Sequence, residues 1–171
     1  SQHLLGLIND VLDMSKIENG KTVLNVRNFS LPELIEELDS IIRPQARAKE
    51  QTFDIVVHDI HNENLVGDKQ RISQVMINIL SNAVKYTPAG GNINMSVEQV
   101  DMPSAHLAHI CFRISDDGIG MSPEYLEDIF QPFSREVRTV VNKVQGTGLG
   151  MAITKSLVDL MGGTITVDSK L

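Results

Sequence analysis

Three short stretches of this chain carry residue types that could bind a ligand. In the first, Asn78, Asn82 and Lys85 are four and three residues apart, so they share one face of a predicted helix. Amide oxygens can bind a hard cation, and an ammonium group can offset anionic charge. A solvated face usually carries Glu and Lys, since Asn is a mediocre helix former. The three residues on this face therefore indicate either a ligand-binding face or an unusual solvated one.

The second stretch, Asp116-Asp117-Gly118-Ile119-Gly120, comes directly after an alternating apolar segment. An aspartate at the end of a strand can accept a hydrogen bond from the amino group of a nucleobase. Gly118 and Gly120 let the backbone turn tightly and approach a ligand. Asp-Gly turns are common, so this stretch is a weak signal when taken alone.

The third stretch, Gly146-Thr147-Gly148-Leu149-Gly150, opens a segment of helical periodicity. Glycines before a helix expose backbone N–H groups, and the helix dipole favours phosphate at that end. The spacing matches a dinucleotide-binding fingerprint only loosely, because a loop and not a strand precedes it. A P-loop is excluded, because no Lys-Ser or Lys-Thr pair follows the last glycine.

The segments that must position these residues follow from hydrophobic periodicity and turn signals. Helices are predicted over residues 1–19, after the capping box Ser30-Leu31-Pro32-Glu33, over 68–86, after Ser122 and over 148–161. Strands are predicted over residues 52–58, 92–98 and 109–115 and from Ile165 onward. Two of these strands follow one another without a helix between them. The order therefore predicts an α/β (α+β) two-layer sandwich, with a mixed sheet covered on one face by helices.

The amino-acid composition excludes several classes of partner and site. The 171 residues include 15 Lys and Arg and 22 Asp and Glu, a net charge of −7, so nucleic acid is not an expected partner. The single cysteine, Cys111, excludes an internal disulfide and a cysteine-based zinc site. No apolar run reaches the roughly 18 residues of a membrane span. We expect a cytoplasmic location, and leave open a longer parent protein anchored in the inner or plasma membrane.

Four motifs, in chain order, resemble the nucleotide-binding boxes of sensor histidine kinases. Residues 78–87 (NILSNAVKYT) resemble the N box, and residues 116–120 resemble the first glycine box. Residues 130–133 (FQPF) resemble the F box, and residues 146–151 (GTGLGM) resemble the second glycine box. The resemblance implies the Bergerat ATP-binding fold, which gyrase, MutL and heat-shock chaperone ATPases share.

The resemblance also implies a division of the chain into two parts. Residues 1–25 are similar to the end of the second helix of a dimerisation domain and its connector. Residues 26–171 would be the catalytic ATP-binding domain, cut short at its C-terminus because the family continues past Ser169 with a further strand.

Residue roles carry over from the matching motifs. Asn82 would bind Mg²⁺, with Asn78 as its neighbour one turn earlier, which suits an ion that takes few protein ligands. Asp116, with its carboxylate buried, would accept a hydrogen bond from adenine N6 and so favour ATP over GTP. Lys85 would offset phosphate charge, and Tyr86 would pack beside the nucleotide.

The remaining implied roles concern the base, the phosphates and the lid. Gly118 and Gly120 would admit the base. Residues 134–146 would form an ATP lid, in which Arg135 approaches the γ-phosphate; Asn78, Lys85 and Arg135 would be the catalytic residues. The phosphate-binding residues would be Gly146, Thr147, Gly148, Leu149 and Gly150.

The activity that the resemblance implies is that of an ATP-dependent protein-histidine kinase in two-component signal transduction. The γ-phosphoryl group would pass to a histidine on the parent's own dimerisation domain and then to a response regulator receiver domain. The acceptor lies on a first dimerisation helix in this family, so none of the five histidines here is expected to be the acceptor. We expect this fragment to be a monomer and the parent protein to be a homodimer.

Three alternatives remain open at this point. One is a nucleotide-sensing interaction module without phosphotransfer, which would use the same pocket. Another is a conformational ATPase of the gyrase type, but those enzymes place a Glu where Asn78 stands, and an amide cannot act as a base. A serine or threonine kinase built on the same fold is a third.

Overall fold

The structure, a computed structural model, describes residues 2–100, 106–131 and 150–169. They fall into two compact units, one formed by residues 26–119 and the other by residues 1–25 together with 120–171. The predicted domain boundary at residue 25 remains a prediction.

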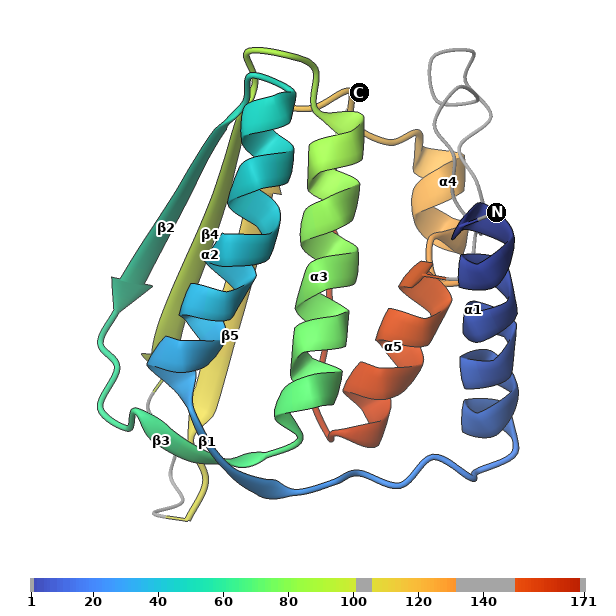
Figure 1. Cartoon of the computed structure of the whole chain (residues 1–171), viewed down its shortest axis with the longest axis vertical. Helices are drawn as coiled ribbons and strands as arrows, with labels where there is room; N and C mark the ends of the chain where they lie inside the picture. The colour runs from blue at the N-terminus through green and yellow to red at the C-terminus, as the bar shows by residue number, and fades with distance from the viewer. Residues whose placement is uncertain (1, 101–105, 132–149, 170–171) are drawn as a thin grey trace. The chain divides into compact units, whose positions relative to one another are not determined.

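The unit of residues 26–119 is built on a mixed sheet of three described strands (Figure 1). The strands are β2 (Thr52–His58), β4 (Asn92–Val100) and β5 (His109–Asp116), in the order β2-β4-β5. The β2 and β4 strands are parallel, whereas β4 and β5 are antiparallel. This sheet confirms the predicted fold class and extends two of the three predicted strands by only one or two residues.

Two helices, α2 (Leu31–Ala48) and α3 (Lys69–Tyr86), cover one face of this sheet (Figure 1). The α2 helix begins where the capping box predicts, since Ser30 Oγ accepts a hydrogen bond from the Glu33 N–H at 3.3 Å. Fully buried aliphatic side chains from both helices and from β4 form the core: Leu34, Leu38, Ile42, Leu80, Ile93, Met95 and Val97. The scarcity of aromatic residues thus gives an aliphatic core.

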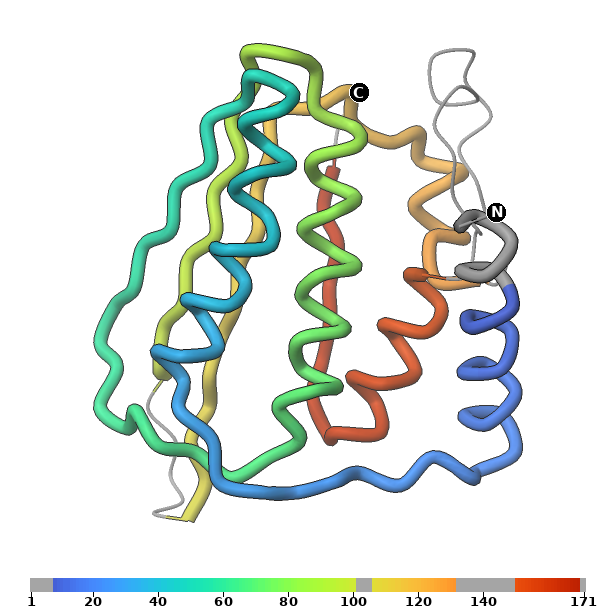
Figure 2. Tube along the Cα trace, viewed as in Figure 1, coloured from blue at the N-terminus to red at the C-terminus, as the bar shows by residue number. Residues whose placement is uncertain are grey.

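The connections at one end of the sheet run beside one another, as Figure 2 shows for the α2–β2 and α3–β4 turns. The Gly90 N–H donates to the Glu50 carbonyl at 3.0 Å, and the Thr52 N–H donates to the Gly91 carbonyl at 2.9 Å. The parallel pairing of β2 with β4 therefore starts from turns that are themselves bonded together.

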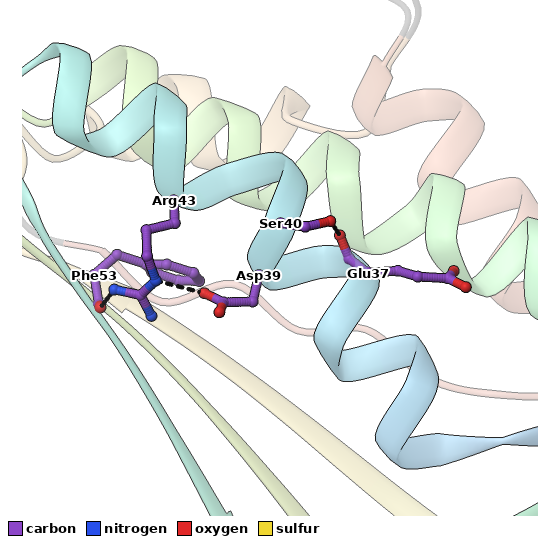
Figure 3. Close-up of polar contacts among 5 residues, drawn as sticks. All are labelled: Glu37, Asp39, Ser40, Arg43 and Phe53. Atoms are coloured by element: carbon purple, nitrogen blue, oxygen red, sulfur yellow. Dashed lines mark hydrogen bonds and ion pairs between the residues drawn. The ribbon is translucent and has the colours of Figure 1, made fainter.

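Polar contacts join α2 to the β2 strand (Figure 3). Arg43 Nη1 donates to the Phe53 carbonyl at 2.8 Å, and its guanidinium lies 5.2 Å from the centroid of the Phe53 ring. Asp39 Oδ1 accepts from Arg43 Nε at 2.7 Å, which fixes the guanidinium from the preceding turn of the helix. A cation above an aromatic face is favourable, so Arg43 helps to orient α2 on the sheet.

A two-stranded ribbon was not predicted. Its strands, β1 (Arg27–Ser30) and β3 (Asn64–Gly67), pair antiparallel with Arg27 opposite Gly67. Each strand has four residues, too few for an alternating pattern to stand out. Their pairing depends on contacts between segments distant in sequence.

The other unit contains three described helices: α1 (Gln2–Glu18), α4 (Pro123–Asp128) and α5 (Gly150–Leu160). The α1 helix packs against α5, and Ser122 caps α4 as predicted, its Oγ accepting from the Tyr125 N–H at 3.2 Å.

The predicted strand from Ile165 was wrong, because residues 163–169 pair with no strand among the described residues. An alternating pattern favours an extended chain, but a strand also needs a ladder partner. Among the described helices, none has the length and apolar character to cross a membrane.

Candidate functional site

The α3 helix separates an apolar face from a polar one. Its buried residues are Val75, Met76, Leu80, Ala83 and Val84. Asn78 and Asn82 are half-buried, and Lys85 is exposed in the last turn. Because the hydrophobic stripe is fixed against the core, the three polar side chains belong to the part of the helix that remains accessible.

The end of β5 meets the end of α3. The Ile119 N–H donates to the Tyr86 carbonyl at 3.2 Å. Asp116 Oδ1 accepts from the Gly118 N–H at 2.9 Å, so the carboxylate stabilises its own turn. The expectation of a buried carboxylate was wrong, since Asp116 is exposed. At the end of the strand the chain turns away, which leaves the carboxylate accessible to a ligand.

Gly118 is required here because there is no space for a side chain. A Cβ atom at this position would lie 2.6 Å from the Tyr86 carbonyl oxygen and 2.7 Å from Asp116 Oδ1. The first of these is a backbone atom, so it cannot rotate away. The glycine therefore allows the strand end and the helix end to approach this closely.

Thr87 fills the space between two glycines. It is fully buried, its Oγ1 lies 3.1 Å from the position that a Gly118 Cβ would take, and its Cγ2 faces Gly91. Within the described residues its hydroxyl makes no hydrogen bond. The backbone of Thr87 is well held, because its N–H donates to the Ala83 carbonyl at 3.1 Å as the C-cap of α3.

Asp117 has a different role from its neighbour Asp116. Its Oδ1 accepts from the Asn92 N–H at 2.7 Å, and its Oδ2 accepts from Asn92 Nδ2 at 2.9 Å. These hydrogen bonds lower the pKa of Asp117 from its ordinary value, because they favour the carboxylate. The pair fixes the first residue of β4 to the end of β5, directly beside the Asp116 turn.

The predicted site residues therefore divide into three groups. Asn78, Asn82, Lys85, Tyr86, Asp116 and Gly118 all lie in the unit of residues 26–119. Gly120 and Gly150 lie in the other unit, where Gly150 is the first residue of α5. Arg135, Gly146, Thr147, Gly148 and Leu149, with the predicted lid, lie outside the described residues.

Four residues at this end of the sheet were assigned no role from the sequence: Thr87, Gly91, Asn92 and Asp117. The Gly90-Gly91 pair and the doubled aspartate were visible signals, but neither says what it contacts. The described residues contain no group of three His, Cys, Asp or Glu side chains that could hold a metal ion. A cation held here would depend on amide oxygens such as those of Asn78 and Asn82, which suits Mg²⁺ with its few protein ligands.

Comparison with known proteins identifies the family. Residues 67–171 match the family described as histidine kinase-, DNA gyrase B- and HSP90-like ATPases. The chain belongs to this family. The match begins just before α3 and includes every predicted site residue of this ATPase domain, and it confirms the resemblance stated from the motifs.

Several relatives of this ATPase domain are named as sensor kinases. The chain is 38% identical over 175 residues to the autoinducer 2 sensor kinase/phosphatase LuxQ of Vibrio vulnificus, covering 99% of the chain and 20% of that protein. It is 39% identical over 168 residues to the sensor histidine kinase GacS of Pseudomonas protegens, covering 97% of the chain and 18% of that protein. The chain thus spans about a fifth of the length of these relatives.

Solved structures of histidine kinases share this fold. One nucleotide-free structure of the catalytic domain of the kinase ThkA is similar with a TM-score of 0.63 and 29% identity, over 80% of this chain and 82% of that one. Full-length ShkA in complex with AMPPNP is similar with a TM-score of 0.75 and 27% identity, over 94% of this chain and 31% of that one.

Proposed function

We propose that this domain binds Mg·ATP and donates the γ-phosphoryl group to a histidine on the dimerisation domain of its parent protein. The observation that carries the proposal is the contact between the end of β5 and the end of α3. There an accessible carboxylate, Asp116, lies next to a turn whose glycine is packed on the last residues of α3. Asn78, Asn82 and Lys85 belong to that same helix.

Each residue would act by positioning or by charge. Asp116 would accept a hydrogen bond from an exocyclic amino group, which adenine has and the corresponding position of guanine lacks. Lys85 would offset phosphate charge. Asn82 and Asn78 would hold Mg²⁺, which supplies charge neutralisation for the phosphates when it is bound. Phosphoryl transfer depends mainly on such positioning and electrostatic stabilisation, so no nucleophile is required from this domain.

The amide of Asn78 also argues against steady hydrolysis of ATP. A conformational ATPase needs a base that activates water, and an amide does not accept a proton at neutral pH. We propose that the phosphoryl group goes from the acceptor histidine to the receiver domain of a response regulator. This assignment rests on the sensor kinases among the relatives.

Calorimetric titration of this chain with ATP and GTP, each with and without Mg²⁺, tests the binding step. We expect ATP to bind, GTP to bind more weakly, and Mg²⁺ to strengthen the binding of ATP. Absence of ATP binding at millimolar nucleotide would overturn the proposal.

Incubation with γ-labelled ATP tests the transfer step. The fragment alone should form no acid-labile, alkali-stable phosphohistidine, whereas adding the parent's dimerisation domain should restore some label. The restored label is expected to be weak, because the tether that supplies effective concentration is missing. Label on the isolated fragment would show that an acceptor lies within these 171 residues.

A further inference from the structure

Two side chains outside the nucleotide-binding motifs hold the last turn of α3. Lys49 Nζ donates to the carbonyls of Val84 at 2.7 Å, Lys85 at 3.2 Å and Thr87 at 2.9 Å. Gln51 Nε2 donates to the carbonyls of Val84 at 2.9 Å and Thr87 at 2.6 Å. Both donors come from the turn between α2 and β2, more than thirty residues earlier in the chain.

These contacts satisfy backbone carbonyls that the end of a helix leaves unpaired. The last carbonyls of a helix have no partner within the helix, and the dipole makes that end negative. The Lys49 ammonium has three N–H donors and uses them on three carbonyls. Gln51 is 7% exposed, so its two bonds are made where water does not compete. Charge and donor number therefore both match the end of α3.

Backbone conformation and backbone hydrogen bonds fix the turn that carries these two side chains. Glu50, which lies between them, has a left-handed φ of 57°. Its carbonyl accepts from the Gly90 N–H at 3.0 Å, and the Thr52 N–H donates to the Gly91 carbonyl at 2.9 Å. The α2–β2 turn is thus bonded to the loop that follows α3, beside which it runs (Figure 2).

The same turn of α3 also contacts the loop that follows Asp116. The Tyr86 carbonyl accepts from the Ile119 N–H at 3.2 Å, and a Cβ on Gly118 would lie 2.6 Å from that carbonyl oxygen. This hydrogen bond and the close approach of the Gly118 backbone link the helix end to the turn. A displacement of the Val84–Thr87 carbonyls would therefore move Tyr86, Gly118 and the adjoining Asp116 carboxylate.

We propose that Lys49 and Gln51 are positioning residues, which act through the α3 carbonyls to hold Asp116, Gly118 and Lys85 in the geometry that binds nucleotide. This inference rests on the proposed function of the site. Preorganising a site lowers the ordering that binding must otherwise impose, so loss of the positioning contacts should weaken affinity in a protein that remains folded.

The test is the Lys49→Met variant, with Lys69→Met as its matched control. Lys69 lies at the opposite end of α3, where its Nζ is 2.7 Å from Glu37 Oε1. Each variant removes one ammonium group from one end of the same helix. Calorimetry should show about tenfold weaker binding of Mg·ATP by Lys49→Met, the equivalent of losing one hydrogen bond to a charged group. Lys69→Met should bind as the wild type does, and Lys49→Arg should recover part of the loss.

Amide hydrogen exchange without nucleotide gives a second readout that a general loss of stability would not produce. Lys49→Met should speed exchange of the Thr87 and Ile119 amides and leave the amides in the middle of α3 unchanged. If Lys49→Met does not fold, Gln51→Leu takes its place, since it removes two of the five bonds and keeps an uncharged side chain of similar size.

Each outcome has one meaning. Unchanged affinity in Lys49→Met, or equal losses in Lys49→Met and Lys69→Met, would overturn the positioning role while leaving ATP binding established. Uniformly faster exchange along α3 would also overturn it. A wild-type protein that binds no ATP would instead refute the proposed function on which the inference depends.

Discussion

The two ends of α3 are held in different ways. At the start, Asp68 Oδ1 accepts from the Arg71 N–H at 3.1 Å, and Lys69 makes a partly exposed ion pair with Glu37. At the end, the carbonyls accept hydrogen bonds from Lys49 and Gln51 and from the loop after β5. The first end is fixed chiefly by its own cap, whereas the second is fixed by segments that also form the candidate site. Stability and nucleotide affinity should therefore respond to substitutions at different ends of this helix.

The largest effect is expected at the second end, from Gly118→Ala. The added Cβ would lie 2.6 Å from the Tyr86 carbonyl oxygen, so the helix end and the Asp116 turn must separate. Overpacking of this kind costs up to about 3 kcal/mol. Because it displaces the Asp116 turn, we expect ATP affinity to fall by up to about 150-fold, the equivalent of that free energy. Calorimetry measures the loss, with Gly163→Ala as the control, because a Cβ there meets nothing closer than 3.4 Å. Equal affinities of the two variants would contradict the close-approach argument.

Asp116→Ala should cost less, about tenfold in ATP affinity, the value of one hydrogen bond to a charged group. The exposed carboxylate is not left buried and unpaired in the free protein, so no larger penalty is expected. The variant should also lose most of its preference for ATP over GTP. Competition of the two nucleotides for the variant measures this preference, and an unchanged ratio would remove Asp116 from the base-binding site.

Asn82→Ala should weaken Mg·ATP binding by a smaller factor, roughly fivefold, because Mg²⁺ keeps phosphate and water ligands when one protein ligand is lost. Binding of ADP without metal should change little. Parallel titrations with and without Mg²⁺ separate the two effects. Equal losses in both titrations would mean that Asn82 supports the helix and not the ion.

At the first end of α3, Asp68→Ala should lower the free energy of unfolding by about 1 kcal/mol, the usual cost of losing an N-cap. The affinity of the folded protein for ATP should be unchanged. Urea unfolding gives the stability, and calorimetry well below the unfolding transition gives the affinity. A loss of affinity comparable to that of Asp116→Ala would erase the difference between the two ends.

The smallest effect is expected from pH. Hydrogen bonds from the backbone and the side chain of Asn92 lower the pKa of Asp117 below its ordinary value of 3.8. The stabilisation is therefore present above the ordinary pKa and is lost as the pH falls through the lower folded pKa. Unfolding measured across the acid range should show a weaker pH dependence in Asp117→Asn than in the wild type. Asp54→Asn on β2 is the control, and an identical change in both variants would contradict the prediction.

The sequence by itself determined the elements and the family. The 3.6-residue period of α3 and the alternation in β2, β4 and β5 are local signals, and the structure has each element where it was predicted. The nucleotide-binding motifs are likewise short and contiguous, which is why the resemblance could be seen before any fold was known. Periodicity failed where strands depend on distant partners. The four-residue β1 and β3 were missed, and the strand predicted from Ile165 onward is not formed by the described residues 165–169.

Only the tertiary structure decided which residues support the site. Two adjacent aspartates look alike in sequence. The Asp116 carboxylate nevertheless accepts a hydrogen bond within its own turn, whereas the Asp117 carboxylate accepts from Asn92. Lys49 and Gln51 belong to no recognisable motif. The positioning role proposed for them depends on the end of a helix more than thirty residues later in the chain. The physical reason is that unpaired backbone carbonyls accept any suitable donor that folding brings near. Such partners are selected by proximity in space, which residue type and local spacing do not encode.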